Sequence, residues 1–491
     1  MEKKNKFYIT TAIAYTNAPP HLGHALEFVQ TDVLARYHRL LGHDTYFLTG
    51  TDEHGSTVAR AAKNARINPQ EFVDELVKKF KSLDAALDVQ YDQFIRTTDR
   101  TIHWPAVEKL WRALVASGDV YKKEYEGLYC VGHEAFIKKT ELEDGLCPLH
   151  KAAPEVVREE NWFFRLTKYK DRVREKIESG ELNIVPAHRK QEILNLIDDA
   201  EDVSFSRPQE TLEWGIPVPD DPTQTIYVWA DALTNYISAL GYGTPRSDLG
   251  GKRSDLFSHF WPADVHLIGK DILRFHALYW PAMLLAVGVP LPRAIYVHGF
   301  ITIEGQKMSK TVGNVIDPFM LVEKYGSDVV RYFLLREIPS GDDGDFSYKN
   351  LEARYNADLA NGLGNFISRV TTMADGLAFG SDMTLSPAIE QAIIHTKEKM
   401  REAIDTFRLN DALAVLWELI SFGDTYVNEK KPWETKDRQI LFDLTVLADN
   451  VGALVAPFMP RTSAKIQECI RWDEQGLRAR KSAGLFPRLA A

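Results

Sequence analysis

The hydrophobic pattern of the first 55 residues predicts a strand, a helix and a second strand. Residues 8–14 form a β-branched and apolar run, typical of a buried parallel strand, and the turn-forming segment 17–20 follows it. Residues 24–41 then repeat apolar side chains every three or four positions and end before Gly42, as an amphipathic helix does. A short apolar strand is expected at 46–48. This strand–helix–strand unit predicts a parallel α/β sheet.

Polar residues gather where the two predicted strands end. The second strand runs into TGTDEHG at 49–55, and HLGH begins the helix after the first. Open α/β sheets bind ligands at that edge. His21 and His24 share one helix face, above amide donors and the positive end of the helix dipole, so they could bind phosphate oxygens. Gly23 leaves room for a base or sugar, although HxGH alone also fits surface histidines at a helix cap.

Further along, the pattern predicts three more regions. Residues 69–118 read as crossover helices, and the stretch from about 116 to 222 reads as an insertion between the two halves of the sheet. The second half is expected to contain the following elements: strands at 224–229, 265–271 and 294–300, and a helix at 272–287. A helical bundle follows, with helices expected at 354–373, 387–407, 411–428, 436–458 and 461–469. The tail carries four basic residues and is expected to be surface-packed or frayed: Arg478, Arg480, Lys481 and Arg488.

The predicted fold class is therefore α/β, with a split Rossmann-like parallel sheet, an inserted connective domain and a C-terminal all-α bundle. The expected domain boundaries are 1–115 for the first half of the catalytic sheet, 116–222 for the insertion, 223–348 for the second half and 349–491 for the bundle.

The composition is that of a globular protein in a reducing compartment. The chain has 491 residues, of which 45% are hydrophobic and 26% charged. We expect neither a membrane span nor a signal peptide, because no apolar run approaches about 20 residues. Three cysteines argue against a disulfide framework and favour the cytoplasm. The net charge of −10 argues against gross electrostatic attraction to nucleic acid, although a local basic groove is compatible with it.

Two C-x2-H pairs in the insertion predict a zinc site. Cys130 and His133 are followed by Cys147 and His150, a spacing that fits two knuckles around one ion. Thiolate and imidazole suit tetrahedral Zn²⁺, and such an ion could replace a small apolar core. The alternative is that two of the three cysteines fall beside histidines by chance. Cys469, on a predicted helix, is expected to be a packing residue.

A polar loop after the strand at 294–300 carries a second candidate for phosphate chemistry. Gly305 marks a tight turn, and Lys307 and Lys310 follow it. A mobile loop of this kind could close on phosphate and neutralise charge as it develops. A lysine pair on its own is equally typical of a solvated surface.

Taken together, these residues resemble class I aminoacyl-tRNA synthetases, and among them the methionyl-tRNA synthetases. HLGH at 21–24 resembles the HIGH motif of that class, and KMSKT at 307–311 resembles its KMSKS loop, with Thr311 in place of the last serine. The motifs stand in the required order, one in each half of the interrupted sheet. The similarity extends from residue 8 to about residue 460.

The resemblance implies a methionine pocket built from three segments, A-x-x-Y, Y-V-W-x-D-A and G-K-D-I-x-x-F-H. Its implied methionine-binding residues are Ala12, Ile13, Tyr15, Asp52, Trp229, Tyr236, Ile272 and His276. Asp52 would hold the α-amino group, and aromatic rings suit the thioether. Leu233 stands where some relatives have proline, so that wall may differ. Isolated aromatic residues are usually core residues, but three segments coincide here.

The resemblance also implies the nucleotide and RNA contacts. The ATP-binding residues would be His21, Gly23, His24, Gly269, Asp271 and Lys310, and the catalytic ones His21, His24, Lys307 and Lys310. Asn365 and Arg369, four apart on one helix, and Trp433 would read the anticodon. Family members carry one or two zinc knuckles in the insertion. His133 replaces the commoner cysteine there.

The implied activity is that of a methionine–tRNA ligase. It would form methionyl-adenylate from L-methionine and ATP with Mg²⁺, then charge initiator and elongator tRNA(Met). One Zn²⁺ and a cytoplasmic enzyme without membrane partners are expected. A monomer is expected because no appended β-barrel RNA-binding module, which dimeric relatives carry, is evident.

Three other functions remain open on the sequence. Leucine, isoleucine and valine synthetases carry a much larger editing insertion, and the cysteine enzymes use an active-site zinc for which no cysteine lies near HLGH. A small-molecule adenylyltransferase shares HxGH but would leave the helical bundle unexplained. A non-catalytic RNA-binding descendant would not need HLGH together with both loop lysines.

Overall fold

The computed structural model describes residues 5–132, 135–148, 151–244, 255–307, 315–474 and 476–489, without the side chains of Ala135 and Lys307. The chain divides into two compact units. The first, here called the sheet unit, comprises Met1–Pro20, His38–Ser82 and Gln90–Val297. The second, the bundle unit, comprises His21–Tyr37, Leu83–Val89 and His298–Ala491.

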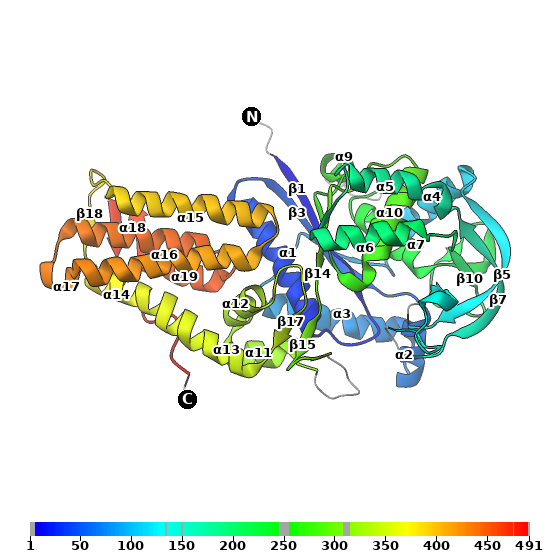
Figure 1. Cartoon of the computed structure of the whole chain (residues 1–491), viewed down its shortest axis with the longest axis horizontal. Coiled ribbons are helices and arrows are strands. Elements are labelled where there is room, and N and C mark those ends of the chain that lie inside the picture. The colour runs from blue at the N-terminus through cyan, green and yellow to red at the C-terminus, as the bar shows by residue number, and fades with distance from the viewer. Residues whose placement is uncertain are drawn as a thin grey trace. The chain divides into compact units, whose positions relative to one another are not determined.

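A parallel sheet forms the core of the sheet unit (Figure 1). Its strands are β1 (Lys6–Thr11), β2 (Ala14–Tyr15), β3 (Asp44–Asp52), β4 (Gln93–Arg96), β8 (Asn183–Val185), β13 (Val265–Gly269) and β14 (Ala294–His298). Their order is β2-β3-β1-β13-β14-β8, with β4 beside β3. Tyr8 of β1 is in register with Tyr46 of β3, and Ile9 with Val265 of β13. The two halves of the sheet therefore meet at β1, which confirms the predicted Rossmann-like arrangement.

Helices and apolar side chains cover this sheet. The α-helices of this part of the chain are α2 (Ser56–Ala65), α3 (Pro69–Ala86), α4 (His103–Ala116), α5 (Lys170–Glu178), α6 (Ala187–Asp198), α7 (Val228–Ala232), α8 (Asn235–Ser238), α9 (Leu256–Phe260) and α10 (Trp280–Ala286). One buried cluster joins strand residues such as Tyr8 and Leu48 to Trp280 of α10. The burial of such large side chains supplies most of the favourable free energy of folding.

One predicted strand is partly wrong. The run at 224–229 was expected to stay extended, but β12 (Asp221–Ile226) ends early and α7 begins at Val228. The amide groups of Ala230 and Asp231 donate to the carbonyl oxygen of Tyr227, which turns the chain into a helix. Trp229 therefore projects from a helical turn rather than from a strand.

The predicted insertion consists mainly of short antiparallel sheets. The first contains β5 (Val120–Cys130), β6 (Ala135–Ile137), β7 (Glu155–Phe164) and β9 (Val203–Ser204); the second contains β10 (Ser206–Pro208), β11 (Pro217–Val218) and β12. Strand β8 also lies in this stretch of sequence, yet it pairs in parallel with β14 of the main sheet.

Helices dominate the bundle unit, as predicted. They are α1 (Leu22–Leu40), whose last residues belong to the sheet unit, α11 (Pro318–Tyr325), α12 (Ser327–Glu337), α13 (Tyr348–Arg354), α14 (Asn365–Met373), α15 (Pro387–Asp405), α16 (Leu409–Lys430), α17 (Pro432–Thr435), α18 (Arg438–Val455) and α19 (Pro460–Cys469). Helix α16 packs against α15 and α18 (Figure 1). Among the described residues, no helix is long and apolar enough to cross a membrane.

The basic tail is more ordered than a frayed end. It contributes β19 (Ile470–Asp473) and β20 (Gly476–Ala479), which pair with each other and with β18 (Ala378–Phe379). Gly476 has φ +111°, and a Cβ there would lie 1.9 Å from the Phe379 carbonyl oxygen, so the turn requires glycine. The apolar side chains of Ile470 and Leu477 are fully buried and anchor this small sheet.

Candidate active site

The carboxyl ends of β1 and β3 bring together several side chains of the predicted methionine pocket. Strand β2 runs beside β3 so that Tyr15 is in register with Asp52. The amide and hydroxyl groups of Thr16 both donate to the Asp52 carbonyl oxygen, at 2.9 Å each, which fixes this strand end. The amide of Ala12 donates to the Leu267 carbonyl oxygen on β13. The acid at position 52 therefore lies beside the aromatic ring at position 15.

An aromatic stack forms a second part of the pocket region. The Trp229 ring stacks on Phe275 with centroids 3.8 Å apart and planes 6° from parallel, and it meets His276 edge-on. Phe275 and His276 belong to a π-helix, η4 (Phe275–Tyr279), directly before α10. Such π-helical turns occur frequently at functional sites because they re-aim side chains. No pattern in the sequence indicated the π-helix, and Phe275 was not among the predicted pocket residues.

The hydrogen bonds around His276 define its tautomer. Its Nδ1 lies 2.9 Å from the Ile272 carbonyl oxygen, which can only accept, so Nδ1 carries a hydrogen. Its Nε2 lies 2.6 Å from the Tyr236 hydroxyl. Burial lowers the pKa of His276 to about 4, so the ring is neutral near pH 7 and its Nε2 accepts from that hydroxyl. His276 thereby links Ile272 to Tyr236.

Most of the other predicted pocket residues belong to the buried apolar cluster of the sheet unit or pack against it. Ala12 and Tyr236 are members of the buried core, and Ile13, Tyr15, Trp229 and Ile272 pack against it. Gly269 is the last residue of β13, and Asp271 follows in a short 3₁₀ turn, η3 (Lys270–Ile272). The structure thus gathers the residues from three separate sequence segments into one unit.

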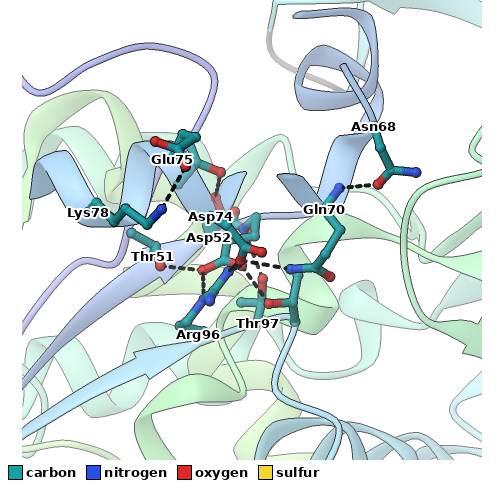
Figure 2. Close-up of polar contacts among 12 residues, drawn as sticks. Thr51, Asp52, Asn68, Gln70, Asp74, Glu75, Lys78, Arg96 and Thr97 are labelled. Carbon is teal, nitrogen blue, oxygen red and sulfur yellow. Dashed lines mark hydrogen bonds and ion pairs between the residues drawn. The ribbon is translucent and has the colours of Figure 1, made fainter. Parts of the chain in front are cut away.

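A buried glutamate flanks Asp52 and holds the strand end in place. Arg96, at the end of β4, donates from Nε and Nη2 to the two carboxylate oxygens of Glu53, at 2.7 and 2.8 Å. It also reaches Asp74 on α3 (Figure 2). Burial by itself lowers the pKa of Arg96, but its hydrogen bonds to Glu53 and Asp74 raise that pKa above its usual value. The bidentate pair fixes the backbone next to Asp52.

In the bundle unit, the two histidines of HLGH stack on each other. Their ring centroids are 3.9 Å apart, the amide of His21 donates to His24 Nδ1, and the amide of Gly23 donates to His21 Nδ1. A Cβ at Gly23 would lie 2.9 Å from His21 Cε1, so the small residue is also needed for this pairing. Burial lowers the pKa of His24 well below its usual value, and charge on His21 and His298 lowers it further.

His298 is a third imidazole near HLGH, and sequence reasoning missed it. Its Nε2 lies 3.1 Å from the Glu27 carboxylate, and its Nδ1 lies 2.8 Å from the Gly299 carbonyl oxygen. Both neighbours are hydrogen-bond acceptors, so they orient the imidazole from its two nitrogen atoms. One sequence signal could have identified it. His298 is a polar residue at the carboxyl end of an apolar strand, as Asp52 is at the end of β3.

The loop that carries the two predicted lysines starts from an anchored hairpin. Strands β15 (Ile301–Ile303) and β16 (Gln306–Lys307) are joined by a turn in which Gly305 has φ +76°, as expected. Asp345 accepts from the Gly305 amide at 2.7 Å and from the Thr302 hydroxyl at 2.6 Å. Lys310 lies outside the described residues, as does the side chain of Lys307.

Comparisons with known proteins agree on one family. The family model for class I tRNA synthetases (M) matches residues 7–149 and 134–371. The methionine–tRNA ligases of Caldanaerobacter subterraneus and Thermotoga maritima are each 42% identical, and the alignments cover 99% and 96% of this chain and 79% and 76% of those proteins. The Mycobacterium tuberculosis methionyl-tRNA synthetase in complex with methionyl-adenylate superimposes with a TM-score of 0.91 at 36% identity, covering 99% of this chain and 100% of that one.

The chain belongs to the methionyl-tRNA synthetase family. The similarity is therefore not limited to two short motifs. It covers almost the whole chain, in sequence and in structure.

In this synthetase, two of the three predicted anticodon residues lie together in the bundle unit. Arg369 Nη1 lies 3.1 Å from Asp424, its Nη2 donates to Asn428 at 2.7 Å, and its guanidinium lies 5.9 Å from the Trp433 ring centroid. Trp433 is 47% exposed, which is unusual for so large an aromatic side chain. Asn365 is exposed one helical turn before Arg369 on α14.

The predicted zinc ligands of the synthetase are only partly described. Cys130 and Cys147 are both buried and share one small cluster with Ile137. His133 and His150 lie outside the described residues. Within the described ranges, no three His, Cys, Asp or Glu side chains are arranged to hold a metal ion.

Proposed function

We propose that this protein is a methionine–tRNA ligase, which forms methionyl-adenylate and pyrophosphate from L-methionine and ATP and then transfers the methionyl group to tRNA(Met). The observation that carries this proposal is the aromatic cluster of Trp229, Phe275 and Tyr236 around a neutral His276, in the same sheet unit as Asp52. Full-length similarity to named methionine–tRNA ligases supports it. Initiator and elongator tRNA(Met) are both substrates, for translation initiation and elongation.

The methionine side chain binds among rings. Trp229, Tyr15 and His276 offer faces and edges that attract a polarisable sulfur, and Ala12, Ile13 and Ile272 supply apolar contacts. The Asp52 carboxylate pairs with the α-ammonium group. The hydrogen bond between Tyr236 and His276 joins two neutral groups, so neither can pair with a charged ligand side chain. Such a side chain would therefore be bound poorly.

The phosphates of ATP are held by His21, His24 and the amides around Gly23, with Gly269 and Asp271 contributing to nucleotide binding. Mg²⁺ accompanies the nucleotide and neutralises part of its charge. Lys307 and Lys310 bind the departing pyrophosphate, and Lys310 is the more important of the two. The methionine carboxylate itself attacks the α-phosphate, so positioning and charge stabilisation account for catalysis without a protein nucleophile.

The bundle unit reads the anticodon. An exposed Trp433 ring with the Arg369 guanidinium beside it offers a stacking surface for an unpaired base, and Asn365 supplies hydrogen bonds. Removing the ring, as in Trp433→Ala, should raise the KM for tRNA by about tenfold, since one base–aromatic stack contributes ~1–3 kcal/mol. Methionine-dependent ATP–pyrophosphate exchange without tRNA should stay unchanged.

The insertion holds one zinc ion through Cys130, His133, Cys147 and His150. The two described cysteines share a buried cluster, which supports a common ligand set, and their thiolates suit tetrahedral zinc. Bound metal would replace apolar core in that small domain. Metal analysis of the purified protein should give about one zinc per chain, and Cys130→Ser should reduce it.

The division of labour follows the sequence boundaries. Residues 1–115 and 223–348 form the catalytic domain, 116–222 the connective domain, and 349–491 the anticodon-binding domain. The enzyme acts as a cytoplasmic monomer without a membrane partner.

The deciding experiment is an amino-acid panel in ATP–pyrophosphate exchange. Methionine alone among the standard amino acids should support exchange. Lys310→Ala should lose it, while Lys399→Ala, which removes an exposed lysine paired with Glu402 on α15, should not. Exchange with another amino acid would identify a different class I synthetase. No exchange with any amino acid would favour an adenylyltransferase or a non-catalytic RNA-binding protein, and unchanged exchange in Lys310→Ala would refute the role of that lysine.

A further inference from the structure

A fully buried carboxylate, Asp231, contacts two histidines and lies two residues from Trp229, one of the proposed methionine-binding residues. The Oδ2 of Asp231 lies 2.7 Å from His54 Nδ1, and its Oδ1 lies 2.7 Å from His103 Nε2. All three side chains are withdrawn from solvent. The catalytic scheme above uses none of them.

These contacts connect the elements that carry the pocket residues. Asp231 lies on α7, two residues after Trp229. His54 lies two residues after Asp52, at the end of β3. A single carboxylate therefore bridges the segment that binds the α-ammonium group and the helix that supplies the indole.

The chain of hydrogen bonds continues to a third pocket element. His103, the first residue of α4, approaches the hydroxyl of Ser238 through its Nδ1, at 2.9 Å. Ser238 belongs to α8, which also carries Tyr236. The network thus ends on the helix whose tyrosine hydroxyl bonds to His276.

The network is electrostatically satisfied. Burial by itself raises the pKa of Asp231, but the nearby His54 and His103 lower it below its usual value. The carboxylate is therefore ionised and accepts an N–H hydrogen bond on each oxygen. Charged hydrogen bonds in a buried environment are short, strong and directional, so they hold the three elements in one arrangement.

A second contact restrains His54 from its other side. Its ring lies edge-on to Trp214, with centroids 5.6 Å apart. Trp214 donates its indole N–H to the Glu53 carbonyl oxygen and accepts from the Gly55 amide through its own carbonyl oxygen. The backbone on both sides of His54 is therefore fixed, and the remaining freedom of the ring is set by Asp231.

We propose that Asp231 is a positioning residue that, through His54 and the His103–Ser238 pair, fixes Asp52, Trp229 and Tyr236 relative to one another and thereby sets the affinity for methionine. This inference rests on the proposed function. It assigns no contact between Asp231 and substrate.

The test is steady-state ATP–pyrophosphate exchange with the full-length protein. Asp231→Asn keeps the side-chain volume but places an amide N–H against an imidazole N–H. It should raise the KM for methionine by about tenfold, because displaced binding groups lose contacts throughout the pocket. The kcat and the KM for ATP should change by less than about threefold.

Two variants of His54 test the same series of hydrogen bonds, one expected to keep the contact with Asp231 and one expected to lose it. In His54→Asn the amide nitrogen takes the place of Nδ1 and can still donate to Asp231, whereas His54→Leu cannot. The leucine variant should show the raised KM for methionine, and the asparagine variant should recover most of the affinity. The double variant His54→Leu/Asp231→Asn should be no worse than Asp231→Asn, because both remove one interaction.

Asp264→Asn is the matched control. Asp264 is a carboxylate at the opposite end of the sheet, where it accepts from the Tyr8 amide and from Arg293. Its replacement should leave the KM for methionine unchanged. If Asp231→Asn does not fold, the His54 pair decides.

The outcomes separate the two proposals. If the wild-type protein shows no methionine-dependent exchange, the proposed function fails. If the wild type is active and the folded Asp231 and His54 variants keep its KM for methionine, only the positioning role fails. Equal losses toward methionine and ATP, unrelieved in His54→Asn, would mean a general loss of structure and would also overturn it.

Discussion

Two groups of histidines, one in each unit of the molecule, are held in contrasting ways. In the sheet unit, His266 and His276 are buried and each finds a neutral partner: Thr10 for the first, and Tyr236 with a backbone carbonyl for the second. In the bundle unit, His21 and His24 stack on each other.

The difference indicates what each group is built to meet. Burial lowers the pKa of both His266 and His276, and their hydrogen bonds suit neutral rings, which fits an apolar thioether side chain. The pKa of His24 is lowered by burial and then by two imidazoles, His21 and His298, which repel its charged form. A bound polyanion would attract the charged form of these rings and offset the repulsion between them. The His21–His24 pair is therefore suited to bind phosphates. The experiments that follow test this contrast.

The largest effect is expected from His24→Asn. The asparagine carbonyl can still accept from the His21 amide, as Nδ1 does, but the ring and its second nitrogen are lost. We expect kcat in ATP–pyrophosphate exchange to fall about 100-fold, as when one preorganised donor to a transition state is removed. The KM for methionine should stay within about twofold. A rise in that KM with unchanged kcat would place His24 with the methionine group instead.

The pH dependence of the free energy of unfolding should show that the His276 ring is neutral in the folded protein. The folded-state pKa of His276 is lowered to about 4 from an unfolded value of 6.5, so the unfolded state binds more protons between these values. The stability that this ring contributes is complete above about pH 6.5 and is lost as the pH falls toward 4. Between pH 6.5 and 5 the loss should be about 2 kcal/mol, at ~1.4 kcal/mol per pKa unit.

Urea unfolding at a series of pH values measures this loss. In His276→Phe the ring no longer titrates, so the loss over that interval should be smaller by the same amount. His395→Gln, on an exposed position of α15, is the control and should retain the wild-type slope. A wild-type slope in His276→Phe would show that the ring is charged when folded.

A smaller effect on activity is expected from the same His276→Phe change. The phenyl ring keeps the apolar body that faces Trp229 but cannot accept from the Tyr236 hydroxyl. That hydroxyl is then left without its partner, at a cost of ~1–3 kcal/mol for a buried polar group. We expect the KM for methionine to rise about tenfold and the KM for ATP to stay constant. A change confined to ATP would contradict the contrast between the groups.

The sequence predicted the elements better than it predicted the supporting contacts. Strands β1, β3 and β13 and the bundle helices follow from apolar runs and helical spacing, because burial dictates both patterns. Trp229 was placed in a strand because the aromatic and β-branched run around it has no helical period. The helical turn there is closed by the amides of Ala230 and Asp231, which donate to the Tyr227 carbonyl oxygen.

The site could be predicted only as far as short motifs reach. HLGH and the pocket segments are local in sequence, so they could be recognised. His298 with Glu27, and Asp231 with His54 and His103, are joined across long sequence separations, and no local pattern marks such pairs. The π-helix that contains His276 is likewise marked by no local sequence pattern.

The smallest and most discriminating effect should be proton uptake on ligand binding. Near pH 6, slightly below the ordinary histidine pKa of about 6.5, a neutral His24 beside a bound triphosphate would regain its proton on Nδ1 in place of the hydrogen bond from the His21 amide, because the anion favours the charged ring. Binding of Mg·ATP should therefore take up a fraction of a proton that is absent in His24→Asn. The difference between the two proteins cancels protons that belong to the nucleotide itself. Methionine binding should take up none in either protein, because the pKa of His276 lies near 4 and the methionine side chain that it meets carries no charge. Titration calorimetry in buffers of different ionisation enthalpy measures both quantities. Equal uptake for the two ligands would mean that the two histidine groups are not electrostatically distinct.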